Sequence, residues 1–199
     1  TRAFLFLHIA DPMAEDGATT YDARVTKADQ SVGRLVRYLK EHQLYDQSTI
    51  VLVSDHGQGL GEQGEAGHGL LLNDDVLHTP LIVKQAAGAG AGRRVSTPVQ
   101  QIDIVPTILD LAKAPVPGNL RGRSLAPLLD DADFTDERVF YAESLFGRYH
   151  FGWDALTAVT DGHFLYTGGT SPQLLDLDAD GTSHANLADE RPDLVTRFQ

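Results

Sequence analysis

The sequence predicts an α/β fold with a mostly parallel central sheet, flanking helices and a small antiparallel sheet at the C-terminal end. Short continuous apolar runs alternate with a helical pattern, and polar residues begin where the runs end. Beyond Pro127, short strand-like segments follow one another, separated by glycines and acidic turns. The 199 residues are enough to bury a core.

The N-terminal part predicts a strand, a helix and a second strand. Ala3–Ile9 is a continuous apolar run, as in strands buried on both faces of a sheet. From Tyr21 to Lys40 apolar residues recur at steps of three and four, which indicates an amphipathic helix. A second buried strand follows at Ser48–Ser54. This order predicts a right-handed parallel crossover.

The middle of the chain continues the alternation. A glycine-rich loop at Gly57–Gly69 precedes a short helix at Asn73–Leu77 and an apolar strand at Thr79–Lys84. Ile102–Ala112 predicts a further helix, with Pro106 in its first turn.

The C-terminal part predicts the antiparallel sheet, with strands at Val139–Ala142, Ala155–Thr160, Phe164–Thr167 and Gln173–Leu177. We therefore expect two subdomains packed together, residues 1–129 as the α/β core and residues 130–199 as the smaller part.

Composition excludes several classes of protein. The formal net charge of −12 disfavours a nucleic-acid partner, because such proteins need clustered Lys and Arg against phosphates. An anionic substrate would be repelled unless a metal ion reversed the local field. Cysteine is absent, so disulfides and thiolate ligands cannot contribute. The longest apolar runs are too short to span a membrane.

The strongest chemical pattern is Ser54-Asp55-His56-Gly57, directly after a buried strand. Ligands of open α/β sheets collect at the carboxyl ends of strands. A carboxylate and a neutral imidazole form a common pair of ligands for a divalent metal. Adjacent strand residues point to opposite faces, so the two converge only if the chain bends, which Gly57 permits. The alternative is that Asp55 caps a turn and His56 is merely exposed.

Two further histidines are candidates for the same site. His68 lies between two glycines in the loop that starts at the Asp-His turn, and His8 ends the first predicted strand. Taken singly, a solvated loop histidine and a histidine at the edge of the core are the more common situations. The argument for function is that both fall at a strand end or in the loop that follows one.

Several segments together resemble the sulfatase family of the alkaline phosphatase superfamily, in order and in spacing. They are Phe4–His8, Tyr21–Ala23, Ser54–Gly57, Gly67–Gly69, Thr79–Val83, Asp103–Thr107, Gly122–Leu125, Tyr141–Ser144 and Leu174–Leu187. The resemblance covers nearly the whole chain and implies the C-terminal part of an incomplete alkaline phosphatase-like α/β fold.

The resemblance implies roles for the four candidates. Asp55 and His56 take the positions of two metal ligands, where many sulfatases have Asp-Asn and phosphonate or phosphate ester hydrolases more often have Asp-His. His68 resembles the residue on the sulfuryl group, and His8 the histidine that assists the leaving oxygen. The expected cofactor is a divalent ion, either calcium or manganese, zinc or magnesium, which polarises the ester.

The family nucleophile is a formylglycine, or an unmodified Ser or Thr, followed by Pro and Arg. Neither Cys-x-Pro-x-Arg nor Ser-x-Pro-x-Arg occurs here. We therefore expect the nucleophile and the other acidic ligands in an N-terminal half outside this chain. The chain alone would then be an inactive half of a sulfuric ester hydrolase acting on small-molecule or glycan esters.

Two alternatives remain at this point. One is a phosphatase, phosphonate monoester hydrolase or phosphoglycerol transferase of the same superfamily, which the Asp-His pair permits. The other is a non-catalytic binding domain that has kept the fold. By resemblance to bacterial relatives, a periplasmic or otherwise extracytoplasmic location is expected.

Overall fold

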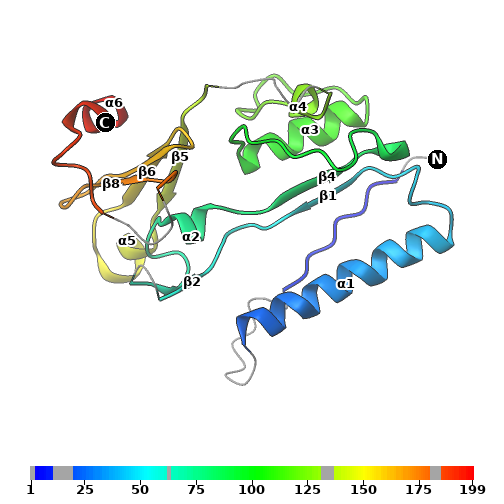
Figure 1. Ribbon diagram of the computed structural model, residues 1–199, viewed down its shortest axis with the longest axis horizontal. Coiled ribbons are helices and arrows are strands. Elements are labelled where there is room, and N and C mark those ends of the chain that lie inside the picture. Colours follow the sequence, from blue (N-terminus) through cyan, green and yellow to red (C-terminus); the bar gives the residue numbers. More distant parts are fainter. Residues whose placement is uncertain (1–2, 11–19, 62–63, 131–136, 180–184) are drawn as a thin grey trace. The chain divides into compact units, whose positions relative to one another are not determined.

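The computed structural model describes residues 3–10, 20–61, 64–130, 137–179 and 185–199 (Figure 1). Contacts between Cα atoms divide the chain into two compact units. One comprises Thr1–Ile50 and Lys84–Ala91, and the other Val51–Val83 and Gly92–Gln199.

Helix α1 (Tyr21–Glu41) dominates the first unit, close to its predicted bounds. The side chain of Thr20 caps it by accepting a hydrogen bond from the amide of Ala23 (3.3 Å). Of the predicted apolar positions, only Val25 is exposed, whereas the others are half-buried and most of the polar residues between them are exposed. The sequence periodicity therefore identified this helix and its inward face correctly.

The predicted strand at Ala3–Ile9 is not formed, and with it the predicted parallel crossover is not seen among the described residues. Phe4, Leu5, Phe6 and Leu7 are instead exposed. A strand exists only where a neighbour accepts and donates its backbone hydrogen bonds, and no described segment pairs with this one.

Strands β1 (Ile50–Val53) and β4 (Leu81–Lys84) lie where the apolar runs predicted strands. They form a two-stranded sheet, and the mostly parallel central sheet expected from the sequence is not seen among the described residues. Pairing continues beyond the strand ends, where the amides of Ser54 and Gly57 donate to the carbonyls of Pro80 (3.4 Å) and Val76 (2.7 Å). Going from Ser54 to Gly57, the bonded residue moves back from Pro80 to Val76, so these two segments run antiparallel. Helix α2 (Asp74–Leu77) lies between them in sequence.

A tight hairpin follows β1. Strands β2 (Gly59–Leu60) and β3 (Ala66–Gly67) pair antiparallel, Gly59 with Gly67 and Leu60 with Ala66. This short pairing returns the glycine-rich loop to its starting point beside the end of β1.

The C-terminal antiparallel sheet is confirmed. Its order is β5 (Phe140–Ser144), β6 (Leu156–Thr160), β7 (Phe164–Thr167) and β8 (Gln173–Asp176), with every neighbouring pair antiparallel. Helix α5 (Phe146–Phe151) connects β5 to β6, and α6 (Pro192–Phe198) ends the chain.

Successive strand residues point to opposite sides, and both faces of this sheet carry buried residues, although Tyr141 and Glu143 of β5 are exposed. Leu165 and Leu175 pack on one face with Ala158 and Leu72, and Leu72 comes from the loop after His68. The other face is covered by α6, through a cluster of Tyr166, Leu174, Leu194 and Phe198. Through Leu72, the loop that follows His68 packs on the C-terminal sheet.

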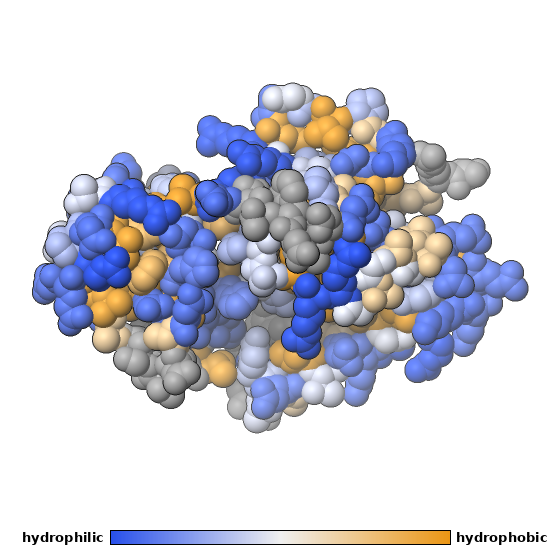
Figure 2. Space-filling model, turned by 45° about the horizontal axis from the view of Figure 1, so that its top comes forward, coloured by the Kyte–Doolittle hydropathy of each residue, from blue (hydrophilic) through white to orange (hydrophobic). Residues whose placement is uncertain are grey.

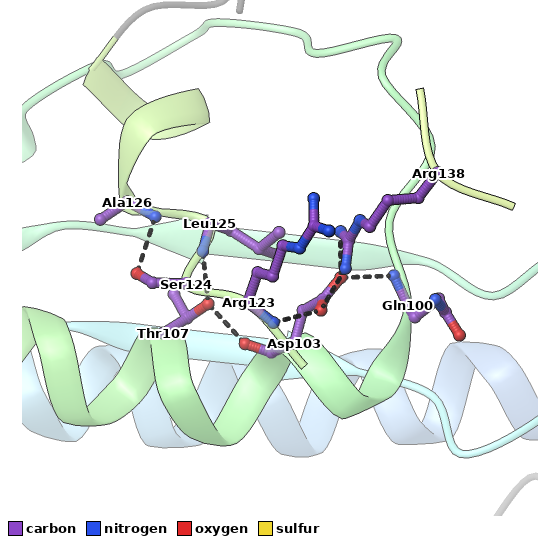
Figure 3. A network of polar contacts seen from close by, with 8 residues as sticks. All are labelled: Gln100, Asp103, Thr107, Arg123, Ser124, Leu125, Ala126 and Arg138. Atoms are coloured by element: carbon purple, nitrogen blue, oxygen red, sulfur yellow. Dashed lines mark hydrogen bonds and ion pairs between the residues drawn. The ribbon is translucent and has the colours of Figure 1, made fainter. Parts of the chain in front are cut away.

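A buried carboxylate organises the rest of the second unit (Figure 3). Asp103, which is 0% exposed, ends the 3₁₀ turn η3 (Gln101–Asp103) just before helix α3 (Ile104–Leu111). Arg138 donates two hydrogen bonds to its carboxylate (3.0 and 2.9 Å). The amides of Gln100 (3.0 Å) and Arg123 (2.8 Å) donate two more.

A second link runs through the start of α3. The hydroxyl of Thr107 donates to the Asp103 carbonyl (2.5 Å) and accepts from the amide of Leu125 (2.8 Å), just before helix α4 (Ala126–Asp130). The chain passes very close here, since a Cβ at Gly122 would lie 1.9 Å from the Ile102 carbonyl oxygen. Two sequence segments far apart are thereby joined.

The pKa of the Asp103 carboxyl differs from its ordinary value. Burial alone raises its pKa, but the hydrogen bonds from Arg138, Arg123 and Gln100 and the guanidinium charge outweigh burial and hold the pKa below its ordinary value. The carboxylate is therefore charged at neutral pH, and its partners satisfy that charge.

The surface combines polar regions with scattered apolar residues (Figure 2). In the part of the chain that the structure describes, no helix has both the length and the apolar character to cross a membrane.

Asp103→Asn should lower the free energy of unfolding by about 3–5 kcal/mol, because it leaves the Arg138 charge buried without its counter-charge. Urea titration of the protein measures this. The matched control is Asp193→Asn, which breaks the exposed pair of Asp193 with Arg191 (2.9 Å) and should change the free energy of unfolding far less, because water screens that pair. Equal effects of both variants would contradict the assignment.

The lowered pKa of Asp103 also predicts a pH dependence. The pKa of Asp103 is lower in the folded protein than in the unfolded chain, where it is about 3.9. The carboxylate therefore stabilises the fold fully at pH values above the unfolded pKa. This stabilisation is lost as the pH falls through the pKa of the folded state. Stability should therefore fall with acidification below about pH 4 more steeply in the wild type than in Asp103→Asn. Urea midpoints recorded along a pH series give this slope.

Candidate functional site

The candidate site begins where β1 ends. The hydroxyl of Ser54 donates to the His56 carbonyl (2.6 Å), and the His56 amide donates to Oδ1 of Asp55 (3.1 Å). These two local bonds bend the backbone away from strand geometry. The bend predicted from the alternation of strand side chains is therefore present.

Gly57 is required for a reason that the sequence did not reveal. A Cβ at this position would lie 2.0 Å from the carbonyl oxygen of Asp75 at the start of α2. The amides of Gly57 and Gln58 donate to the carbonyls of Val76 (2.7 Å) and Asp75 (2.9 Å). The glycine thus permits a close backbone approach, and no positive φ is involved.

Asp55 and His56 converge after this bend. Nε2 of His56 lies 3.7 Å from Oδ1 of Asp55, and the two side chains are 25% and 68% exposed. Nδ1 of His56 lies 2.7 Å from the Gly57 carbonyl, which can only accept, so Nδ1 carries the proton. In the neutral ring, Nε2 therefore presents a lone pair beside the carboxylate.

His68 completes the cluster. Its ring stacks on His56, with centroids 3.8 Å apart and planes 20° apart. Nδ1 of His68 lies 3.2 Å from Oε1 of Gln58. The structure thus brings together three of the residues that the sequence singled out.

The buried side chain of Glu65 shapes the loop that presents His68. Its two carboxylate oxygens accept from the amides of Leu70 (2.9 Å) and Leu71 (2.8 Å), so the chain closes around the intervening residues. The sequence reasoning missed this role, for which an acidic residue among glycines was the available signal.

Gln101 is a second residue that the sequence reasoning missed. Its Nε2 donates to the carbonyls of Ser54 (2.9 Å) and Asp55 (2.5 Å) and so holds the bend from outside. Gln101 is placed by η3, whose last residue is the buried Asp103. No local pattern relates an amide to a turn 46 residues earlier, so the sequence gave little sign of it.

His8 is exposed and belongs to the first unit, whereas the other three candidates belong to the second. Its role stays a prediction. Within the described ranges, no group of three or more His, Cys, Asp or Glu residues is arranged to hold a metal ion. The second unit therefore offers a pair of donors, Asp55 and His56, flanked by the imidazole of His68.

Comparison with known proteins supports the resemblance noted in the sequence. Residues 9–114, more than half of the chain, match the model of the family described as sulfatase. Residues 64–193 match the model described as N-sulphoglucosamine sulphohydrolase, C-terminal.

Individual relatives agree. Arylsulfatase K from Gallus gallus is 32% identical over 184 residues, covering 88% of this chain and 34% of the relative. N-acetylglucosamine-6-O-sulfatase from Bacteroides thetaiotaomicron is 34% identical over 111 residues, covering 56% of this chain and 20% of the relative. The chain thus spans about a third or less of these proteins.

A solved structure confirms the fold class. The phosphonate monoester hydrolase SpPMH from Silicibacter pomeroyi matches with a TM-score of 0.76 and 29% identity, covering 89% of this chain and 38% of that one. The alkaline phosphatase-like α/β fold expected from the sequence is therefore present in part.

The Gln101 contacts lead to a test of the turn. Gln101→Met keeps the length of the side chain but removes both donors, so protection of the His56 and Gly57 amides against hydrogen exchange should fall about tenfold. Gln47→Met is the matched control, because the side-chain amide of Gln47 donates to the exposed carbonyl of Gln43 (2.9 Å) in the first unit. Unchanged exchange at His56 in Gln101→Met would show that the contacts do not hold the bend.

Proposed function

This chain belongs to the sulfatase family, and on that premise we propose that its protein is a metal-dependent hydrolase of sulfuric esters. The observation that carries the proposal is the cluster in which Nε2 of His56 lies 3.7 Å from Oδ1 of Asp55 while its ring stacks on His68. Its position, at the end of a strand and beside a glycine-rich loop, suits a ligand site.

The donor pair suits a divalent cation. A carboxylate oxygen and an imidazole nitrogen at this separation can face one ion, and the Gly57 carbonyl fixes the proton of His56 on Nδ1, away from it. An ion bound there would polarise the ester oxygens. Two donors hold an ion weakly, so we propose that further ligands lie outside this chain.

His68 is proposed to bind the oxygens of the transferred group. With Nδ1 directed at Oε1 of Gln58, an imidazolium form of His68 has its Nε2 proton free to donate to an anionic oxygen. The loop closed by Glu65 keeps this ring against His56. His8 is proposed as the group that protonates the leaving oxygen.

The nucleophile is proposed to lie outside these 199 residues. The chain has no cysteine, and its sequence contains no Ser-x-Pro-x-Arg. This chain would then supply part of a metal site and the histidines around the ester, and would be inactive alone.

A second candidate function has one specific observation in its favour. The solved structure with a TM-score of 0.76 is a phosphonate monoester hydrolase, so hydrolysis of phosphonate or phosphate esters is the alternative reaction. Both reactions need the same donor pair, and they differ in the acid whose ester is cleaved.

Hydrolysis of 4-nitrophenyl sulfate and of 4-nitrophenyl phenylphosphonate by the full-length protein tests the function. The sulfate ester should be hydrolysed, chelator should abolish turnover, and a divalent ion should restore it. Preference for the phosphonate would favour the alternative. Hydrolysis of neither ester would contradict both and leave a non-catalytic binding domain.

Asp55→Asn should lower kcat/KM by about 100-fold or more. Removal of a residue that merely hydrogen-bonds to a metal ligand already lowers metal affinity or activity by roughly 10–100-fold, and Asp55 is proposed to bind the ion itself. Metal titration by calorimetry should show weaker binding as well. Asp75→Asn is the matched control, since Asp75 is exposed and lies near the bend but contributes only its backbone. Normal metal affinity in Asp55→Asn would remove Asp55 from the site.

A further inference from the structure

We propose that α5 and the turn after it bind the ring of the alcohol from which the ester is formed. The binding surface, here called the aromatic platform, consists of Phe146, Tyr149, Phe151 and Trp153. The proposal rests on the proposed function, because it names the part of the substrate that the same site receives.

The four rings of the aromatic platform are exposed. Their exposed fractions are 43% for Phe146, 76% for Tyr149, 56% for Phe151 and 58% for Trp153. So much aromatic surface within eight residues is unfavourable in water, and such patches commonly mark binding sites. Flat rings bind other rings by stacking and by edge contacts.

Three of the four rings, those of Phe146, Phe151 and Trp153, have contacts that hold them in place before any ligand arrives. The amide of Trp153 donates to the Gly147 carbonyl (3.2 Å), and the indole lies so close that a Cβ at Gly147 would be 3.1 Å from its Cε3 atom. Gly152, with φ of 72°, turns the chain back to make this contact. Phe151 packs beside the indole, with centroids 4.9 Å apart.

Such preorganisation favours binding, because little side-chain entropy remains to be lost. The first ring is fixed too, since Phe146 stacks on His150 with centroids 4.2 Å apart. A flexible surface residue would instead have to be ordered by the ligand.

The aromatic platform adjoins the loop of His68. The hydroxyl of Ser144, at the end of β5, donates to the carbonyl of Gly69, the residue after His68. The same hydroxyl accepts from the amide of Phe146 (3.4 Å), the first residue of α5. One side chain therefore joins the start of the aromatic platform to the histidine loop.

This connection supports the alcohol part of the ester as the occupant. If His68 holds the transferred group, the alcohol is covalently attached to that group and must lie beside the same loop. The chain carries a net charge of −12, so most of its surface repels an anionic ester. The four aromatic side chains carry no charge and Arg148 of the same helix is cationic, so the organic part can approach here without that repulsion.

The test compares two esters of the acid that the full-length wild type hydrolyses, one of 4-nitrophenol and one of methanol. Tyr149→Ala and Trp153→Ala should each lower the ratio of kcat/KM for the aryl ester to that for the methyl ester about tenfold, through KM. Trp153→Phe keeps an aromatic ring, so this ratio should fall less than in Trp153→Ala. The matched control is Tyr38→Ala, a similarly exposed tyrosine of α1, which should keep the wild-type ratio.

Each other outcome counts against the proposal. An unchanged ratio in Tyr149→Ala and Trp153→Ala, or an equal loss for both esters, would overturn the aromatic platform while the proposed function stands. A second outcome would also overturn the aromatic platform. Trp153 is the one tryptophan of the sequence, so the fluorescence lost in Trp153→Phe comes from its indole. If iodide does not quench that fluorescence in the full-length protein, the rest of the protein covers the indole and no substrate can reach it. Absence of turnover in the wild type would overturn the proposed function, and this inference with it.

Discussion

The second unit depends on one buried charge. Asp103 has no exposure to water, and its carboxylate is neutralised by the two hydrogen bonds from Arg138 and by two backbone amides. A charge without water needs all of these partners at once, so it fixes three chain segments relative to one another. The start of α3, the residues before α4 and the approach to β5 are tied together at this point.

The candidate site takes its geometry from that anchor. Asp103 ends the turn that carries Gln101, and Gln101 in turn holds the carbonyls of Ser54 and Asp55. The bend that brings Asp55 toward His56 is therefore supported from a distant part of the sequence. The histidine loop has its own support, through the carboxylate of Glu65 and the packing of Leu72 on the C-terminal sheet. Site and scaffold are thus one connected structure.

Much of the fold followed from local patterns. Helix α1, strands β1 and β4 and the four-stranded C-terminal sheet were predictable, because amphipathic periodicity and short apolar runs act over neighbouring residues. The strand expected at Ala3–Ile9 was not, since strand formation depends on a partner that an apolar run cannot supply by itself. Membership of the sulfatase family was also readable, from motifs spread along the chain.

The sequence by itself singled out residues that could carry chemistry, because acid and imidazole groups follow strand ends and match a family pattern in order and spacing. It named Asp55, His56, His68 and His8. The structure places the first three together, and the role of His8 stays a prediction. Only the tertiary structure decided what holds them: the amide of Gln101, the buried Asp103 and the contact of Ser144 with the histidine loop. These contacts join residues far apart in sequence, and such pairings are fixed by packing and hydrogen-bond satisfaction, which no local pattern encodes.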